Sequence, residues 1–301
     1  MKKRWIALML GITMIAGLLA GCGSKTTETE APASEDTEAI ETDAPTEDAE
    51  EVTITIFAAK SLNTVMEDLI AAYEADHPGV IIVGSYDSSG TLQAQIQEGA
   101  VCDIFFSAAQ KQMNELEEGG FVVDGTRHNV VNNQVCVVTY DGSETTVTGL
   151  ADIANASSIA LAAGSVPVGK YTRQAMVNAG MLPEAEDVSA ITTEEVSEAL
   201  GGVEINECAN VGAVAAAVVA GANEVGTVYY SDTYGYEDDL VILEYVSYDL
   251  TGNVIYPIAQ IVNKEADDAQ SAAAVEFINF LVSEDAKAVF DSYYFDTNVE
   301  D

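Results

Sequence analysis

The chain has 301 residues, with 50 Asp and Glu against 11 Lys and Arg, and therefore a formal net charge of -39. A nucleic-acid-binding protein needs Lys and Arg to displace counterions from phosphates, so this balance excludes a nucleic-acid partner. His77 and His128 are the only histidines, which leaves little basis for histidine-centred metal chemistry. Because 48% of the residues are hydrophobic and 20% are charged, most of the chain is expected to fold.

Residues 1–21 have the pattern of a secretory signal peptide. A basic start, residues 1–4, precedes an apolar run over residues 5–20 that is too short to predict a membrane-spanning helix. Residues 19–22, Leu-Ala-Gly-Cys, resemble a bacterial lipobox, which implies cleavage before Cys22 and lipidation of its thiol. The alternative is a plain signal peptide with a chance cysteine. We therefore expect an extracytoplasmic protein anchored to the cell membrane by lipid.

Residues 22–51 predict a disordered tether behind the lipidated cysteine. The stretch from residue 24 to residue 51 contains eleven acidic residues, one lysine, two prolines and almost no large apolar side chain. Such a segment cannot bury enough surface to offset the entropy lost on ordering. Residues 52–301 still hold 39 acidic and 7 basic residues, a net charge of about -32, so the folded part is acidic in its own right.

From residue 52 onward, hydrophobic patterns typical of strands alternate with patterns typical of helices. The expected strands are residues 52–58, 80–85, 103–107, 133–140, 158–162, 226–230 and 255–262, and the expected helices are residues 62–73, 91–98, 111–118, 171–179, 211–220, 272–282 and 284–290. This alternation predicts an α/β fold with largely parallel sheets. About 250 residues are many for one core, which favours two lobes with a cleft between them. We assign residues 52–135 and 255–301 to lobe 1, and residues 136–254 to lobe 2.

Cys102, Cys136 and Cys208 lie in largely apolar stretches. Buried free thiols are the favoured interpretation, and one disulfide remains the alternative.

Residues 164–170 fit the first part of a phosphate-binding P-loop, G-x-x-x-x-G-K. The next residue is Tyr171 instead of Ser or Thr, and Pro167 removes one of the amides that would hold phosphate. Nucleotide hydrolysis is therefore not expected.

Four loops of small or polar residues each lead into a predicted helix. These loops are residues 58–61, 87–91, 167–169 and 210–212. In an α/β sheet such loops lie at the carboxyl ends of the strands, so up to four helix N-termini could face one cleft and bind an anion. The alternative is that their Ser and Gly residues only cap helices. Since the domain is strongly acidic, affinity for an anion would have to come from short-range hydrogen bonds.

Several of these segments resemble the molybdate-binding proteins of ABC importers. The matching segments are FAAKSL at 57–62, SSGTL at 88–92, QIQEGA at 95–100, DIFFSA at 103–108, VPVGKY at 166–171, GTVYYSD at 226–232 and IYPI at 255–258. They occur in order over residues 52–295. The resemblance implies a two-lobed periplasmic-binding-protein fold of the second type.

The resemblance also implies a tetrahedral oxyanion held in the cleft without a cationic side chain. Carried over by position, Ser61 and Ser89 would each donate from the hydroxyl and the amide, Val168 and Val211 from the amide, and Tyr229 from the phenol. It implies no cofactor, no metal coordinated by side chains, and a monomer. This sequence departs from the pattern at three positions: Lys60 where a small residue is usual, Val168 where alanine is usual, and Gly212 where arginine is common.

The leading hypothesis is a lipid-anchored protein that captures molybdate or tungstate and delivers it to the permease of an ABC importer. One alternative is a general tetrahedral oxyanion binder. Another is a ferric-ion binding protein of the same fold that uses Tyr229 and Tyr230. Catalysis is not expected, because a serine nucleophile would need a base and neither histidine lies in a motif that would place one. A purely structural surface lipoprotein would not need the matched loops.

Overall fold

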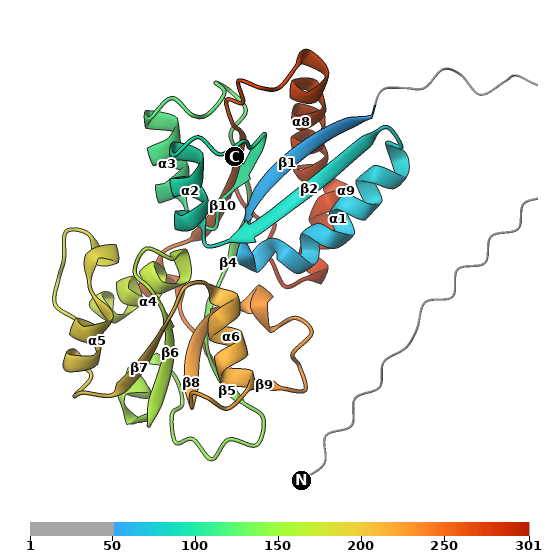
Figure 1. Cartoon of the computed structure of the whole chain (residues 1–301). Coiled ribbons are helices and arrows are strands. Elements are labelled where there is room, and N and C mark those ends of the chain that lie inside the picture. The colour runs from blue at the N-terminus through green and yellow to red at the C-terminus, as the bar shows by residue number, and fades with distance from the viewer. Residues whose placement is uncertain (1–50, 301) are drawn as a thin grey trace, which may run out of the picture. The chain divides into compact units, whose positions relative to one another are not determined.

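The computed structural model describes residues 51–300. The expected signal peptide, Cys22 and all of the tether except its last residue lie outside the described residues. Residues 51–300 form two five-stranded sheets, each covered by helices (Figure 1). We call the first sheet with its helices lobe 1, and the second sheet with its helices lobe 2.

The sheet of lobe 1 has the strand order β2-β1-β3-β10-β4. Its strands are β1 (Val52–Ala59), β2 (Val80–Asp87), β3 (Ile104–Phe106), β4 (His128–Asn133) and β10 (Val254–Gln260). Strand β1 pairs in parallel with β2 and β3, whereas β10 runs antiparallel to both of its neighbours. Alternate side chains of β1 face opposite sides of the sheet, so both of its faces need cover.

Helices pack on both faces of the lobe 1 sheet. They are α1 (Asn63–Asp76), α2 (Ser89–Gln97), α3 (Gln110–Glu118), α8 (Asp268–Leu281) and α9 (Glu284–Ser292). Ile54 and Ile56 belong to the core cluster that includes α1, α8 and α9. Phe57 belongs instead to a separate cluster with Leu92 of α2 and Met113 of α3. The helices therefore hold the strand ends of lobe 1 in place from both sides.

The sheet of lobe 2 has the strand order β7-β6-β8-β5-β9. Its strands are β5 (Val135–Tyr140), β6 (Ser158–Ala162), β7 (Glu204–Cys208), β8 (Val225–Tyr229) and β9 (Leu240–Tyr245). Strand β6 pairs in parallel with β7 and β8, and β5 runs antiparallel to β8 and β9. The helices are α4 (Pro167–Asn178), α5 (Thr193–Ala199), α6 (Val211–Val219) and α7 (Tyr248–Thr251), and short 3₁₀ helices are η1 (Lys60–Leu62), η2 (Leu150–Asn155), η3 (Val188–Ala190) and η4 (Tyr230–Thr233).

The predicted two-lobed α/β fold is confirmed, and each sheet is mixed, with two parallel and two antiparallel pairings. The chain passes from the first sheet to the second at Gln134, which separates β4 from β5, and it returns between β9 and β10. Both passages are short.

Several element boundaries differ from the sequence-based expectation. The single strand expected over residues 133–140 is two strands, because Asn133 ends β4 in one sheet and Val135 begins β5 in the other. Helix α4 begins at Pro167 and not at Tyr171, since proline is well suited to the first helical position. Strands β4, β7 and β9 were not expected at all. All three are edge strands of their sheets. Polar residues weaken the hydrophobic pattern of β4 and β7, whereas β9 is largely apolar and its pattern could have predicted a strand.

The three cysteines of the folded part are free and buried, as predicted. None of the helices within residues 51–300 combines the length and apolar character that a membrane span requires.

Candidate functional site

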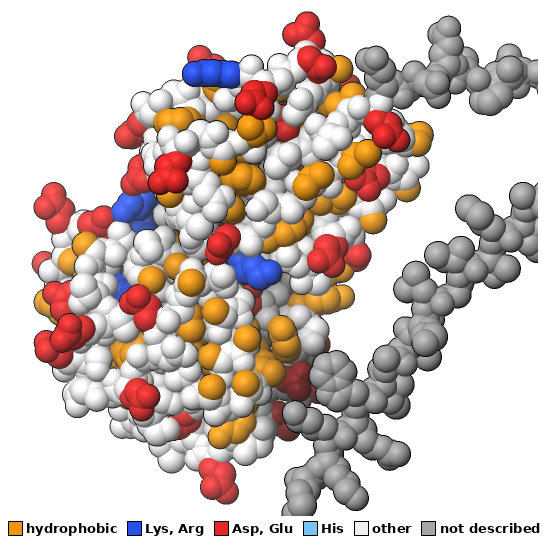
Figure 2. Space-filling model, viewed as in Figure 1, with side chains coloured by type: hydrophobic (Ala, Val, Ile, Leu, Met, Phe, Trp, Pro, Cys, Tyr) orange, Lys and Arg blue, Asp and Glu red, His pale blue; other side chains and the backbone are white. Residues whose placement is uncertain are grey.

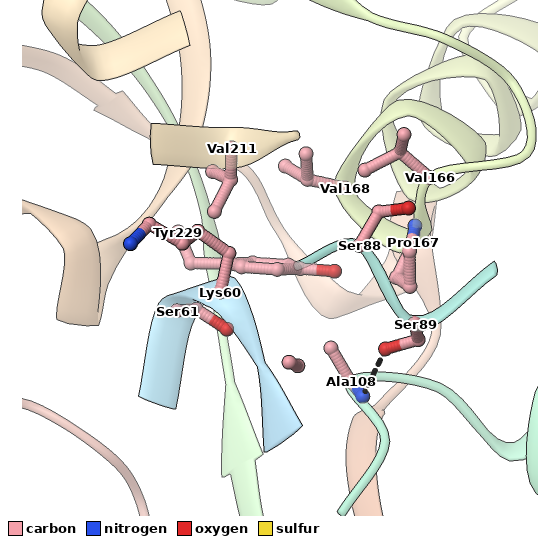
Figure 3. Close-up of a pocket in the computed structure, with 11 residues that line it drawn as sticks. Lys60, Ser61, Ser88, Ser89, Ala108, Val166, Pro167, Val168, Val211 and Tyr229 are labelled. Carbon is pink, nitrogen blue, oxygen red and sulfur yellow. Dashed lines mark hydrogen bonds between the residues drawn. The ribbon is translucent and has the colours of Figure 1, made fainter. Parts of the chain in front are cut away.

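A small pocket lies where the carboxyl ends of strands from both sheets meet (Figure 3). Its empty volume, part of which is open to solvent, is only about 210 Å³. The lining residues are Ala59, Lys60, Ser61, Ser88, Ser89, Ala108, Val166, Pro167, Val168, Val211 and Tyr229. All five residues predicted to bind the oxyanion are among them. The pocket therefore suits a compact ion better than an organic molecule.

Ser61 reaches the pocket from the end of β1, through the short helix η1. Its hydroxyl lies 2.9 Å from the hydroxyl of Tyr256 on β10. Tyr256 is fully buried, and burial raises its pKa well above the ordinary value for tyrosine, so it stays protonated. Tyr256 lies in one of the segments that carry the family resemblance, but no role is predicted for it from the sequence.

Ser89 is the first residue of α2, which follows β2 directly. The preceding residue, Ser88, caps the helix by accepting a hydrogen bond from the amide of Thr91 at 3.1 Å. Ser89 is thus free of the capping role, and its Oγ accepts a hydrogen bond from the amide of Ala108 at 2.9 Å (Figure 3). Its own hydroxyl proton remains available to the pocket.

Val168 is the second residue of α4, where backbone N–H groups have no partner within the helix. Gly169 lets this helix approach β6, because a Cβ atom at that position would lie 2.2 Å from the carbonyl oxygen of Ala163. The fully buried guanidinium of Arg173 donates to the carbonyls of Ala162 at 2.8 Å and Gly169 at 2.9 Å. Burial lowers its pKa to about 10, so it remains charged. Gly169, which belongs to the P-loop-like segment, therefore allows helix α4 to pack closely against the end of β6.

Val211 is the first residue of α6, and the side chain of Asn210 caps this helix through the amide of Ala213 at 3.0 Å. The cap satisfies Ala213, which leaves the amide of Val211 at the pocket. Asn210 Nδ2 also donates to Asp87 of lobe 1 at 3.2 Å. Helices α2, α4 and α6 therefore all direct their N-termini, the positive ends of their dipoles, at this pocket.

Tyr229, at the end of β8, lies almost fully buried with its hydroxyl directed into the pocket (Figure 3). That hydroxyl has no hydrogen-bond partner among the described residues. Burial raises the pKa of Tyr229 well above its ordinary value, so the phenol remains a donor. A buried hydroxyl without a hydrogen-bond partner lowers the stability of the folded protein, so its presence in the pocket indicates that a ligand supplies the partner.

The pocket is lined by neutral hydroxyl and amide groups that can donate hydrogen bonds to an anion. None of its lining residues carries a carboxylate. Lys60 is the one cationic residue in the lining, and Figure 3 shows its nitrogen turned away from the hydroxyls of Ser61, Ser89 and Tyr229. Neutral hydroxyl and amide dipoles would thus surround a bound anion. Figure 2 shows many acidic and few basic side chains on the surrounding surface.

Direct contacts join the two lobes beside the pocket. Lys111 of lobe 1 forms an ion pair with Asp187 of lobe 2 at 2.8 Å and donates to Ser189 at 2.8 Å. A Cβ atom on Gly90 of lobe 1 would lie 2.8 Å from the carbonyl oxygen of Ser165 in lobe 2. The lobes are therefore closed around the pocket.

The tyrosine pair suggested for a ferric ion is not brought together. Tyr229 faces the pocket, whereas the ring of Tyr230 stacks on Tyr294 with 4.6 Å between centroids. Within residues 51–300, no group of three or more His, Cys, Asp or Glu residues could hold a metal ion. Neither His77 nor His128 lines the pocket. The geometry therefore gives no support to a ferric site at Tyr229 and Tyr230.

Comparison with known proteins agrees with this geometry. Residues 54–296 match the family described as bacterial extracellular solute-binding protein. The chain belongs to this family. It is a family of solute-binding, non-enzymatic proteins, which accords with the pocket between two lobes.

Three similar proteins are informative for this solute-binding protein. A Bacillus subtilis protein named as an ABC transporter substrate-binding lipoprotein, YvgL, is 27% identical over 98% of this chain and 99% of its own length. The molybdate-binding protein ModA of Escherichia coli is 29% identical over 82% of this chain and 90% of its own length. The solved substrate-binding domain of a molybdenum ABC transporter from Clostridium difficile is 29% identical, covers 83% of this chain and 100% of its own, and has a TM-score of 0.60.

Proposed function

We propose that this solute-binding protein captures a fully deprotonated tetrahedral oxyanion, molybdate or tungstate, and delivers it to the permease of an ABC importer. Ser61 and Ser89 would donate through hydroxyl and amide, Val168 and Val211 through the amide, and Tyr229 through the phenol. No cofactor takes part, and molybdenum is bound as its oxyanion without coordination by side chains.

The observation that carries this proposal is the buried, unpaired hydroxyl of Tyr229. It shares its pocket with three serine hydroxyls, those of Ser61, Ser88 and Ser89, and with three helix N-termini, all of which can donate hydrogen bonds. Hydrogen bonds to an ionised acceptor are roughly twice as strong as neutral ones, so a dianion would satisfy these donors together. Similarity to proteins named for molybdate binding supports this class of ligand.

Lobe closure is the proposed recognition signal. We propose that lobe 1, which leaves its sheet after Asn133 and returns at Val254, and lobe 2, which lies between these positions in the chain, move as two bodies. The ligand would shift the population toward the closed state. The permease would then recognise the closed surface.

We further propose that the mature protein begins at a lipidated Cys22 and is held on the outer side of the cell membrane by residues 22–51. The lipobox-like residues 19–22 and the lipoprotein name of the B. subtilis relative support the anchor. Replacing Cys22 with alanine should release the protein from the membrane fraction, whereas retention there would contradict the anchor.

Isothermal titration of residues 51–301 with molybdate, tungstate, sulfate and phosphate tests the ligand. Molybdate and tungstate should bind. Phosphate should bind much more weakly, because near neutral pH it carries a proton and the pocket lining offers that proton no carboxylate. Binding of sulfate as tight as that of molybdate would instead indicate a general oxyanion binder, and no binding of any of the four would overturn the proposal.

Tyr229→Phe tests the site with little change of shape. Loss of one charge-assisted hydrogen bond should raise the dissociation constant roughly tenfold or more. Tyr73→Phe is the matched control, because the hydroxyl of Tyr73 is also buried and unpaired but lies outside the pocket. Equal affinities of the two variants for molybdate would contradict the assigned role of Tyr229.

A further inference from the structure

A chain of hydrogen bonds leads from the passage between the two sheets to Ser61. It begins at Asn133, the last residue of β4, which is almost fully buried. The side chain of Asn133 donates to Tyr256 Oη at 3.1 Å and to Ser231 Oγ of lobe 2 at 2.8 Å. Tyr256 in turn lies 2.9 Å from Ser61 Oγ. The chain therefore joins both lobes to one hydroxyl of the pocket.

The orientation of the Asn133 amide follows from its neighbours. Its Oδ1 accepts the backbone amide of Gln134 at 2.9 Å, and the amide of Ser231 lies at 3.5 Å from the same oxygen. Because backbone amides only donate, the oxygen must face them and the NH₂ group must face Tyr256. Asn133 is thus a donor toward the phenol.

This orientation decides where the proton of Tyr256 points. Within the described residues, Tyr256 Oη has two hydrogen-bond partners, Asn133 and Ser61. The neighbouring hydroxyl of Tyr229 makes no hydrogen bond within residues 51–300, and Asn133 Nδ2 has no lone pair to offer. Ser61 Oγ is therefore the acceptor for the phenolic proton. Tyr256 is fully buried, and leaving its proton unpaired would be costly.

Ser61 Oγ therefore accepts a hydrogen bond from Tyr256. The hydroxyl proton of Ser61 is then free to be donated to an anion in the pocket. Ser89 Oγ likewise accepts a hydrogen bond, from the amide of Ala108, so the hydroxyl proton of Ser89 is also free for the anion. A hydroxyl that already accepts a hydrogen bond from the protein needs no reorientation to donate to an anion, and such preorganisation lowers the cost of binding.

We propose that Tyr256 and Asn133 are positioning residues that fix the hydroxyl of Ser61 as a donor to the bound oxyanion. The inference rests on the proposed function. It assigns a specific role to two residues that do not line the pocket, and it makes the affinity of the pocket depend on the passage between the lobes.

A double-mutant cycle with molybdate tests this role. Tyr256→Phe keeps the ring but removes the donor, and it should raise the dissociation constant roughly 3- to 30-fold in the otherwise unchanged protein. In a Ser61→Ala background the same substitution should change the dissociation constant less than about twofold, because Tyr256 acts through the hydroxyl that is already gone. A purely structural role would weaken binding equally in both backgrounds, and that result would overturn the inference.

Asn133→Ala extends the test and replaces Tyr256→Phe if that variant does not fold. It releases the phenol and should also weaken binding only when Ser61 is present; an equal loss in both backgrounds would overturn the inference. Circular dichroism verifies the fold of each variant. A wild-type protein that gives no heat with molybdate would overturn the proposed function before any variant is made, which separates the two failures.

Discussion

Lobe 1 and lobe 2 both present hydrogen-bond donors to the pocket, but they use different parts of the residue to do so. Besides the N-terminus of α2, lobe 1 contributes the side-chain hydroxyls of Ser61 and Ser89, each held by one further hydrogen bond. Lobe 2 contributes helix N-termini at Val168 and Val211, whose side chains are buried hydrocarbon, and one phenol, Tyr229. Lobe 1 should therefore be sensitive to loss of a side chain, and lobe 2 to displacement of its backbone.

The largest expected effect comes from moving the backbone of lobe 2. In Gly169→Ala, the new methyl group would lie 2.2 Å from the carbonyl oxygen of Ala163 and 2.4 Å from that of Ala162, so the start of α4 must shift. Displacing the amide of Val168, together with the positive end of the α4 dipole, would weaken molybdate binding roughly 100-fold or more. The thermal unfolding midpoint should also fall, although alanine is the better helix former, because overpacking costs about 1–3 kcal/mol.

Gly212→Ala is the control for that experiment. It also places a methyl group near the start of a pocket helix, but its closest neighbour is the flexible side chain of Lys60, with Cε at 3.2 Å. Titration should show a change of less than about threefold. Similar losses from Gly169→Ala and Gly212→Ala would mean that the position of α4 is not what matters.

Removing a hydroxyl from lobe 1 should have the next largest effect. Ser89→Ala deletes a donor to the anion and should cost about 1.5–3 kcal/mol of binding free energy, measured by calorimetry. The neighbouring Ser88→Ala removes the cap of α2 and should lower the free energy of unfolding by about 1 kcal/mol while changing affinity less. A larger affinity loss for Ser88→Ala than for Ser89→Ala would reverse the roles assigned to the two serines.

One donor of lobe 2, Tyr229, also stands next to a titratable group whose pKa is shifted. Asp232 accepts a hydrogen bond from the amide of Tyr229 at 3.0 Å. Burial raises the pKa of Asp232 to about 7, and the Tyr229 amide and Lys60 oppose that rise. Below pH 7 the carboxyl is therefore mostly neutral, and above pH 7 it adds a negative charge close to the pocket.

The affinity for molybdate, which is a dianion throughout this range, should consequently fall by up to roughly tenfold between pH 6 and pH 8. Stability should decline as well when the pH rises from about 4 to about 7, because the folded state holds a proton that the unfolded state has released. Asp232→Asn should remove both trends. Asp152→Asn is the control, since backbone and side-chain hydrogen bonds from Thr148 lower the pKa of Asp152 and keep it charged. A pH dependence that survives in Asp232→Asn belongs to another group.

The difference between the lobes also explains what the sequence could predict. Serines in loops ahead of helices are visible as candidate donors, so Ser61 and Ser89 could be proposed from chemistry as well as from resemblance. Val168 and Val211 could be assigned only by resemblance, because no property of a valine side chain marks its amide as a ligand. The roles of Tyr256 and Asn133 depend on contacts with residues far away in the sequence, such as Ser61, which is 195 positions from Tyr256.

The fold, like the site, could be predicted from the sequence only in part. Central strands are hydrophobic on both faces and stood out, whereas the edge strands β4 and β7 did not. Helix α5 was missed although Thr192 and Glu195 form a capping box at its start. Threonine followed three positions later by glutamate is a sequence signal for such a box, so this helix could have been found.

The smallest expected change in affinity gives the sharpest test of the difference between lobe 1 and lobe 2. Val168→Ala shortens a side chain of lobe 2 that is fully buried and leaves its amide in place. The lost packing should lower the free energy of unfolding by about 1–2 kcal/mol, but molybdate affinity should change less than about twofold. Ser89→Ala shortens a similarly buried residue of lobe 1 and should weaken binding at least tenfold. Chemical denaturation of the two variants measures the change in stability, and calorimetry measures the change in affinity. An affinity loss for Val168→Ala as large as that for Ser89→Ala would show that lobe 2 binds the anion through its side chains.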